Sequence, residues 1–475
     1  MKIVKNYLYN VGYNILILLT PLLTVPYISR VLGPSGVGIN ATTNSVITYF
    51  LLAGTVGITI YGNREIAFIR EDDKKRSQTF WEIEFLQITT ISIAYLAFCV
   101  FLYLQNQLKI YFFYQSFLII AGAFDISWFF MGLEDFKKTV IRNMIVKLLS
   151  LASIFVFVKD SHDVGIYILI LSLSQLLGNI TLWPYLPKLV YAPKISELRI
   201  FRHLKPSLAL FVPQVATTIY LAVNKTMLWK LDSVTASGYY DYSDKLVKLV
   251  LAIVTSTGTV MLPHVANLYA KKQINKVKQY LYTSFDFVLS ISIPMAFGIA
   301  SIATALAPWF FGKAFTSVNI LLIIEAPVII LIGQSNVIGQ QYLLPTKQMR
   351  TYTTSVVLGA ITNIIINIPL IMHWGVYGAM VSTLLSELAV TLYQLIMVRK
   401  SLKISALFTN SFKYLFAGVM MFIPVYILNI SMNISTVNLI AQILVGLLVY
   451  VGFLLILQPS IIYKLKSLRK NVSSK

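Results

Sequence analysis

The chain has 475 residues, of which 57% are hydrophobic and only 12% are charged. This is about half the charged share of an ordinary globular protein. The mean hydropathy is +0.75, and apolar runs of roughly 18 residues or more recur along the chain, each long enough to cross the hydrocarbon core of a bilayer. Because lipid cannot satisfy free backbone groups, such runs must be helical. A soluble domain is therefore excluded, and the sequence predicts an all-α polytopic membrane protein.

We expect about 14 transmembrane helices from the length of these runs. Their approximate positions are 7–30, 39–62, 80–104, 110–131, 140–158, 164–185, 206–230, 239–266, 281–307, 317–340, 350–372, 375–398, 412–432 and 436–457.

The net charge of +21 is distributed unevenly between the connections. Lysine and arginine gather in alternate connections, for example in 70–76, 186–205 and 271–278, whereas the opposite connections hold few cations. This is the pattern of the positive-inside rule, so both termini are expected in the cytoplasm of a multi-pass membrane protein. Basic loops beside anionic headgroups explain the charge better than nucleic-acid binding does, and we expect membrane lipids but no nucleic acid as partners.

Short matches at similar offsets indicate two related halves. Ser35-Gly36-Val37-Gly38 opens the second span and Ser237-Gly238-Tyr239-Tyr240 opens the eighth, and Gly165-Ile166-Tyr167 has a counterpart in Gly375-Val376-Tyr377. An offset of six spans predicts a parallel repeat. The expected domains are an N-lobe at 1–185, a linker at 186–205, a C-lobe at 206–400, and two further spans with a basic tail at 401–475.

The linker 186–205 mixes apolar and basic residues and is expected on the cytoplasmic side. An amphipathic segment of this kind can lie flat on the inner leaflet. An ordinary solvated linker is an equally good interpretation.

Ionisable residues inside apolar spans are the functional candidates, because each is costly to place in lipid. In the eighth span, Asp241, Asp244, Lys245 and Lys248 follow helical spacing and share one face. These residues form two i,i+4 pairs of opposite sign, which either neutralise each other at the outer interface or face a watery cavity. Lys225 in the seventh span has no opposite charge nearby in sequence, which favours an aqueous lining or a ligand.

Other charges lie deeper in the predicted spans. Lys147 lies inside the fifth span and can snorkel to the interface. Asp125, Glu325 and Glu387 are too short to do so, and must be protonated, paired or exposed to water. These three acids, together with Asp244, are therefore candidates for coupling to H⁺ or Na⁺. No other cofactor and no metal site is expected.

Catalysis is not expected from this sequence. We find no Walker loop, no Cys/His metal spacing and no large external domain. The chain is therefore predicted not to be an enzyme.

Several strings nevertheless resemble one family. They are PYISRVLGPSGVG (26–38), YGNREIAF (61–68), DISWFFMGLEDF (125–136), NKTMLW (224–229), GYYDYSDKLVKL (238–249), GTVMLPHVANLYA (258–270) and NVIGQQYLLPTK (336–347). Together they resemble the polysaccharide transporter family, the Wzx-type oligosaccharide repeat-unit flippases of the multidrug/oligosaccharidyl-lipid/polysaccharide exporter superfamily. One departure is Asn224, where related sequences often carry Asp before Lys.

The resemblance implies two six-helix lobes arranged as a V around a cavity lined by spans one, two, seven and eight. It also implies an undecaprenyl-pyrophosphate-linked oligosaccharide as substrate, moved from the inner to the outer leaflet of the bacterial cytoplasmic membrane by alternating access, for capsule, exopolysaccharide or O-antigen assembly. A polymerase and glycosyltransferases of the same pathway are expected partners. The candidate substrate-binding cations are Arg30, Arg64, Lys147, Lys225, Lys245 and Lys248.

Alternatives stay open at this point. Within the superfamily they are a flippase for a lipid II-type peptidoglycan precursor and a cation-coupled multidrug antiporter, although the antiporter should present acids at its site. From other classes they are a membrane-embedded glycan polymerase, which needs an external catalytic loop, and a scaffolding protein, which does not need buried acids.

Overall fold

The computed structural model describes residues 2–192 and 195–463 of the chain. Within these ranges all regular elements are helices and there is no strand. Eleven helices of the described part are long and apolar enough to cross a membrane. The segments Leu19–Ile69 and Met349–Val398, of 51 and 50 residues, are more than twice the length that one crossing needs. The predicted all-α polytopic membrane fold is confirmed.

Contacts divide the chain into two compact units, which meet in sequence between Trp229 and Lys230. The helices of the first unit are α1 (Lys2–Thr55), α2 (Ile58–Ile69), α3 (Asp73–Leu104), α4 (Lys109–Gln115), α5 (Phe117–Ala123), α6 (Ser127–Gly132), α7 (Phe136–Phe157), α8 (Val164–Ile180) and most of α9 (Leu204–Leu231). Those of the second are α10 (Val234–Ala270), α11 (Ile274–Phe311), α12 (Val318–Ile338), α13 (Met349–Val398), α14 (Ile404–Leu407), α15 (Ser411–Ser431) and α16 (Thr436–Leu457). The division falls inside α9, whereas the lobes expected from the sequence divide at the linker; those lobes stay a prediction.

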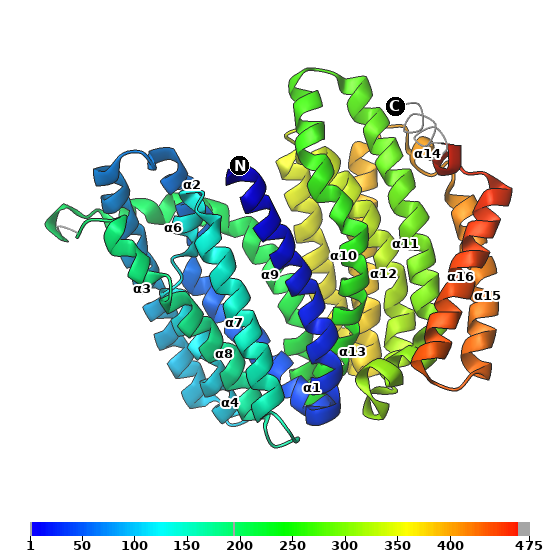
Figure 1. The fold of residues 1–475 in the computed structure, drawn as a ribbon, viewed down its shortest axis with the longest axis horizontal. Coiled ribbons are helices and arrows are strands. Elements are labelled where there is room, and N and C mark those ends of the chain that lie inside the picture. Colours follow the sequence, from blue (N-terminus) through cyan, green and yellow to red (C-terminus); the bar gives the residue numbers. More distant parts are fainter. Residues whose placement is uncertain (1, 193–194, 464–475) are drawn as a thin grey trace. The chain divides into compact units, whose positions relative to one another are not determined.

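The long helix α1 contains a chain reversal at Gly33. Its backbone there has φ 65° and ψ 178°, a conformation open to glycine but strained for other residues. In Figure 1 the N-terminal end of α1 and the following α2 lie at one end of the first unit, and the reversal lies at the other. The expected span 7–30 corresponds to the first arm of this hairpin. The expected span 39–62 covers the second arm and, beyond a break at Val56 and Gly57, the start of α2.

The helix α13 is a second hairpin, which turns at Gly375 with φ 54° and ψ −132°. Hydrogen bonds join its two arms in antiparallel register. Ser382 Oγ donates to the Asn363 carbonyl at 3.2 Å, and Gln394 Nε2 donates to Ser355 Oγ at 2.9 Å. The predicted spans 350–372 and 375–398 are these two arms.

Basic connections of the first unit share one end of it (Figure 1). Arg70 forms an ion pair of 2.8 Å with Glu134, and Arg76 Nη2 donates to the Leu189 carbonyl at 2.8 Å. These contacts join the connection that follows α2 to the one that follows α6, and the start of α3 to the connection that follows α8. The arrangement is the one that the positive-inside rule requires. That this end faces the cytoplasm stays a prediction.

The predicted linker forms short 3₁₀ turns, η1 (Trp183–Lys188), η2 (Ile195–Glu197) and η3 (Ile200–His203), with residues 193–194 outside the described part. The end of this segment is attached to α3 through the fully buried carboxylate of Glu82. Glu82 accepts the Arg199 backbone N–H at 2.8 Å, the Arg202 Nη2 at 2.6 Å and contacts His203 Nε2 at 2.8 Å. Residues 199–203 are therefore attached to the first unit by charged hydrogen bonds.

Candidate functional site

The charged stripe of the second unit lies near the start of α10. Ser233 caps this helix, because its side chain accepts the Ala236 backbone N–H at 3.1 Å. Two turns further on, Lys245 Nζ lies 2.5 Å from Asp241 Oδ2, and Lys248 Nζ lies 2.7 Å from Asp244 Oδ2. The i,i+4 pairs expected from the sequence are thus present as ion pairs. Both acids are buried and both lysines are half-exposed, so the lysines are accessible to a ligand.

Glu325 of α12 connects to this stripe from the neighbouring helix. Its carboxyl group is 1% exposed and accepts a hydrogen bond of 2.8 Å from Ser243 Oγ. It also interacts electrostatically with the Asp244 carboxyl group. Lys248, Asp244 and Glu325 therefore form one network of a cation and two buried acids.

Glu387 occupies the second arm of α13 and is 8% exposed. It lies one turn after Thr383, whose hydroxyl forms a hydrogen bond of 2.9 Å with the Tyr240 hydroxyl of α10. The helices α10, α12 and α13 pack against one another. The three predicted coupling acids of the second unit are thus carried by one group of adjacent helices, and two of them, Asp244 and Glu325, interact electrostatically.

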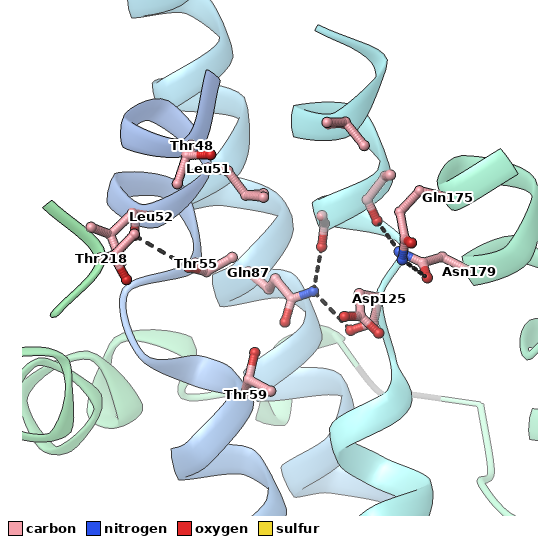
Figure 2. A pocket seen from close by; sticks show the side chains of 13 residues that line it. Thr48, Leu51, Leu52, Thr55, Thr59, Gln87, Asp125, Gln175, Asn179 and Thr218 are labelled. Carbon is pink, nitrogen blue, oxygen red and sulfur yellow. Dashed lines mark hydrogen bonds between the residues drawn. The ribbon is translucent and has the colours of Figure 1, made fainter. Parts of the chain in front are cut away.

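In the first unit, Asp125 lines a polar pocket of about 300 Å³ (Figure 2). The lining side chains come from α1, α2, α3, α5, α8 and α9, and they include Thr48, Thr55, Thr59, Gln87, Asp125, Gln175, Asn179 and Thr218. Leu51, Leu52 and Leu118 line the pocket beside these hydroxyl, amide and carboxyl groups. The polar groups give the pocket partners for water, a proton or a small cation.

The span predicted over 110–131 corresponds to the apolar segment Lys109–Gly132, which is long enough to cross a membrane. The segment is not one continuous helix: it is divided into α4, α5 and α6, with non-helical backbone at Phe124 and Ile126. Gln87 Nε2 donates to the carbonyls of Gly122 at 2.7 Å and Asp125 at 3.0 Å, which replaces helical hydrogen bonds lost at the break. The Asp125 carboxylate in turn accepts the Ser127 backbone N–H at 3.0 Å. The break is what turns Asp125 into the pocket.

Glu84 of α3 is a candidate that the sequence reasoning missed. Its side chain is fully buried, and neither carboxyl oxygen has a hydrogen-bond partner within the described residues. It interacts electrostatically with Asp125. A charged carboxylate in such surroundings is costly. The available signal was the position of Glu84 inside the predicted span 80–104.

The predicted cations of the first unit occupy separate places. Arg30 is exposed and donates from Nη1 to the Pro26 carbonyl at 2.9 Å, three residues before the Gly33 reversal. Arg64 is exposed on α2, with its guanidinium 5.7 Å from the centre of the Tyr61 ring. The second arm of α1 separates the two arginines, so they lie at opposite ends of the unit, roughly one membrane crossing apart. They cannot hold the same phosphate group together.

Lys147 of α7 and Lys225 of α9 are both half-buried. No ion pair involving the Lys147 amine is found in the described part of the chain. Lys225 precedes Thr226, whose hydroxyl lies 3.1 Å from the Tyr49 hydroxyl of α1. The part of α9 that carries Thr226 thus lies next to the second arm of α1.

Comparison with solved structures first identifies the class of fold to which the chain belongs. The fold is similar to that of the lipid II flippase MurJ in an inward closed conformation, with a TM-score of 0.74 over 97% of this chain and all of that one, at 16% identity. It is also similar to an inward-facing multidrug resistance MATE family transporter of the MOP superfamily, with a TM-score of 0.59 over 83% of this chain and 99% of that one, at 11% identity. The chain thus has the fold of a MOP-type transporter, as predicted.

The sequence then identifies the family. Residues 3–269 match the model of the polysaccharide biosynthesis protein family, and the chain belongs to that family. A protein of Shigella dysenteriae named "Putative O-antigen transporter" is 25% identical over 79% of this chain and 95% of its own length. A protein of the same name from Escherichia coli K12 is 22% identical over 81% and 93%. The family resemblance found in the sequence motifs is confirmed.

Proposed function

We propose that this chain is a flippase that moves an undecaprenyl-pyrophosphate-linked oligosaccharide from the inner to the outer leaflet of the bacterial cytoplasmic membrane. The observation that carries the proposal is the similarity, over nearly their whole length, to two proteins named as O-antigen transporters. Capsule, exopolysaccharide or O-antigen assembly is the corresponding process. A polymerase and glycosyltransferases would act with the flippase.

The proposed handling of the headgroup rests on cations in half-buried positions. A diphosphate loses its water shell only when cations and donors replace it, and lysine supplies a point charge while arginine adds bidentate contacts. Lys225, Lys245 and Lys248 offer such charges on α9 and α10. Arg30 and Arg64 would act at different stages of transport, because they lie at opposite ends of the first unit.

The network on α10 and α12 suggests how transport would be coupled to an ion. When no substrate is bound, Asp244 neutralises Lys248. A bound diphosphate would compete for the Lys248 ammonium and leave Asp244 without its cation, beside Glu325. Uptake of H⁺ or Na⁺ at these two acids would then compensate the charge. The polar pocket at Asp125 is a second candidate site for the same ion.

The test is made in the source bacterium. Removal of the gene should abolish surface polysaccharide and leave lipid-linked repeat units on the inner leaflet, and a plasmid copy should restore export. The Lys225→Ala variant should reach the membrane at normal amount without restoring surface polysaccharide. Normal polymer from cells without the gene would contradict the proposal, and normal polymer from Lys225→Ala would exclude Lys225 from the substrate path.

A lipid II-type substrate is the second candidate. It is favoured by 24% identity to the lipid II flippase MurJ of Bacillus subtilis, although this covers only 34% of the chain and 30% of that protein. Rescue of a strain that lacks its lipid II flippase would support this alternative. Failure of that rescue, together with restored surface polysaccharide, would support the main proposal.

A further inference from the structure

A groove of about 930 Å³ lies on the first unit between α7 and α8, outside the residues assigned to transport above. Its walls are apolar over most of their length, with Ile141, Ile145, Val146 and Leu149 from α7 and Leu177 from α8. The two helices approach closely beside it at Gly178, where an added Cβ would lie 2.6 Å from the Val146 side chain. The groove therefore has a closed apolar floor.

Cations gather at only one end of the groove. They are Lys137, Lys138 and Arg142, and Asp135 is the one acid in the lining. This is the end of α7 that the positive-inside pattern predicts to be cytoplasmic. Along α7 beyond Arg142, the lining residues are apolar except for Ser153.

The Arg142 guanidinium is held in place at this end. Its Nη1 donates to Asn179 Oδ1 at 2.7 Å. Asn179 is 2% exposed, and its Nδ2 donates to the Ala121 carbonyl at 2.7 Å. Because the amide that holds Arg142 is itself fixed to the backbone of α5, the charge is preorganised for a ligand.

The two lysines at the mouth, Lys137 and Lys138, differ in their contacts with neighbouring side chains. Lys138 Nζ forms an ion pair of 3.0 Å with Asp135 and lies 5.0 Å from the centre of the Tyr185 ring. Lys137 is exposed at the mouth. With Asp135 subtracted, the mouth carries a net charge of about +2, which complements a phosphate headgroup.

We propose that this groove holds a resident anionic glycerophospholipid of the cytoplasmic leaflet. The phosphate lies at Lys137 and Arg142, and an acyl chain lies along the apolar wall from Ile145 to Leu149. A transported diphosphate headgroup fits less well, because no cation continues along the groove for it to follow. The proposal does not depend on the identity of the transported substrate.

The experiment is native mass spectrometry of the full-length protein in detergent, with phosphatidylglycerol, phosphatidylcholine or undecaprenyl phosphate added at equal concentrations. We expect one retained phosphatidylglycerol. Removal of one cation near a charged headgroup should weaken binding about fivefold, so Lys137→Gln alone should be measurable and Lys137→Gln with Arg142→Gln should lose at least tenfold. Lys276→Gln, an exposed cation on α11, is the matched control and should bind like the unchanged protein.

A second variant tests the apolar wall without touching the charges. Leu149→Trp should fill the groove and reduce phosphatidylglycerol binding while the protein keeps its elution volume and helical circular dichroism. Equal retention of phosphatidylcholine would overturn the proposal, because the cations would then not select an anionic headgroup. Displacement of phosphatidylglycerol by undecaprenyl phosphate at equal concentration would also overturn it and assign the groove to the carrier lipid.

Discussion

Lys248 lies 2.7 Å from Asp244 on α10, and the same Asp244 carboxyl group interacts electrostatically with Glu325 of α12. The charge of a half-exposed lysine is thereby coupled to two buried acids. Any ligand that attracts Lys248 should change the electrostatic balance at this acid pair. We expect this relationship to connect anion binding to ion uptake within the second unit.

Lys248→Gln should reduce transport at least tenfold. It should also destabilise the protein by about 1–3 kcal/mol, since the buried Asp244 carboxylate loses its half-exposed partner. Asp244→Asn combined with Lys248→Gln should recover most of the stability but not the transport, as measured by thermal unfolding in detergent and by export. Lys248→Arg keeps the charge and serves as the control. Full transport by the double variant would remove the pair from the mechanism.

Glu325→Gln should alter how transport depends on the ion gradient. The amide keeps an acceptor for Ser243 Oγ but cannot take up and release a proton, so transport should lose most of its response to an imposed pH or Na⁺ gradient. The check is export measured with and without a protonophore or Na⁺. Glu134→Gln, an exposed acid outside the helices, is the control. An unchanged gradient response in Glu325→Gln would assign the coupling elsewhere, with the Asp125 pocket as the next candidate.

Gly375→Ala should destabilise the α13 hairpin by about 1–3 kcal/mol, because a side chain is strained at this positive φ. The added Cβ would also lie 2.5 Å from Asp232 Oδ2. Gly452→Ala is the matched control: it lies inside α16 with no atom near its added Cβ, so the change should stabilise by up to about 1 kcal/mol. Thermal unfolding in detergent measures both. Equal melting temperatures would contradict the assigned turn.

The attachment of residues 199–203 to α3 should weaken in acid. Burial lowers the pKa of His203 below its usual value, and the neighbouring Arg202 guanidinium also lowers it. The Glu82 carboxylate raises this pKa but does not reverse the shift. A histidine with a lowered folded-state pKa stabilises fully above its unfolded pKa, near 6.5, and this contribution is lost as the pH falls through the folded value. Hydrogen exchange of residues 199–203 should therefore accelerate between about pH 7 and pH 5.

His203→Gln is the control for this acid effect. The variant should show the same exchange at both pH values after correction for intrinsic rates, because the titrating group is gone. A persistent pH response in His203→Gln would contradict the assignment of the acid effect to His203.

Much of the fold could be predicted because apolar runs, glycine turns and i,i+4 pairs depend on short stretches of sequence. Most predicted spans match a helix or one arm of a hairpin, whereas 39–62 and 110–131 are divided between helices. The helices α1 and α13 turn at Gly33 and Gly375, where the backbone needs glycine. The Asp241–Lys245 and Asp244–Lys248 pairs followed from helical spacing alone.

The contacts between helices and the geometry of the candidate site depend on tertiary packing, which the sequence pattern does not reveal. The hydrogen bond from Ser243 to Glu325 joins residues 82 positions apart, and helical periodicity does not reveal which faces of two helices meet. The isolation of Glu84 and the break before α6 likewise depend on Asp125 and Gln87 from different helices. Arg30 and Arg64 could be placed on their helices from sequence, but their separation follows from the α1 hairpin.

The most direct measurement uses the purified chain in liposomes that contain undecaprenyl-pyrophosphate-linked oligosaccharide, with a sugar-modifying reagent outside. A flippase should equilibrate the lipid between leaflets, so that the reagent reaches nearly all of it, while Lys225→Ala at the same protein amount should leave about half protected, as in protein-free vesicles. Equal protection with and without the unchanged protein would contradict the account.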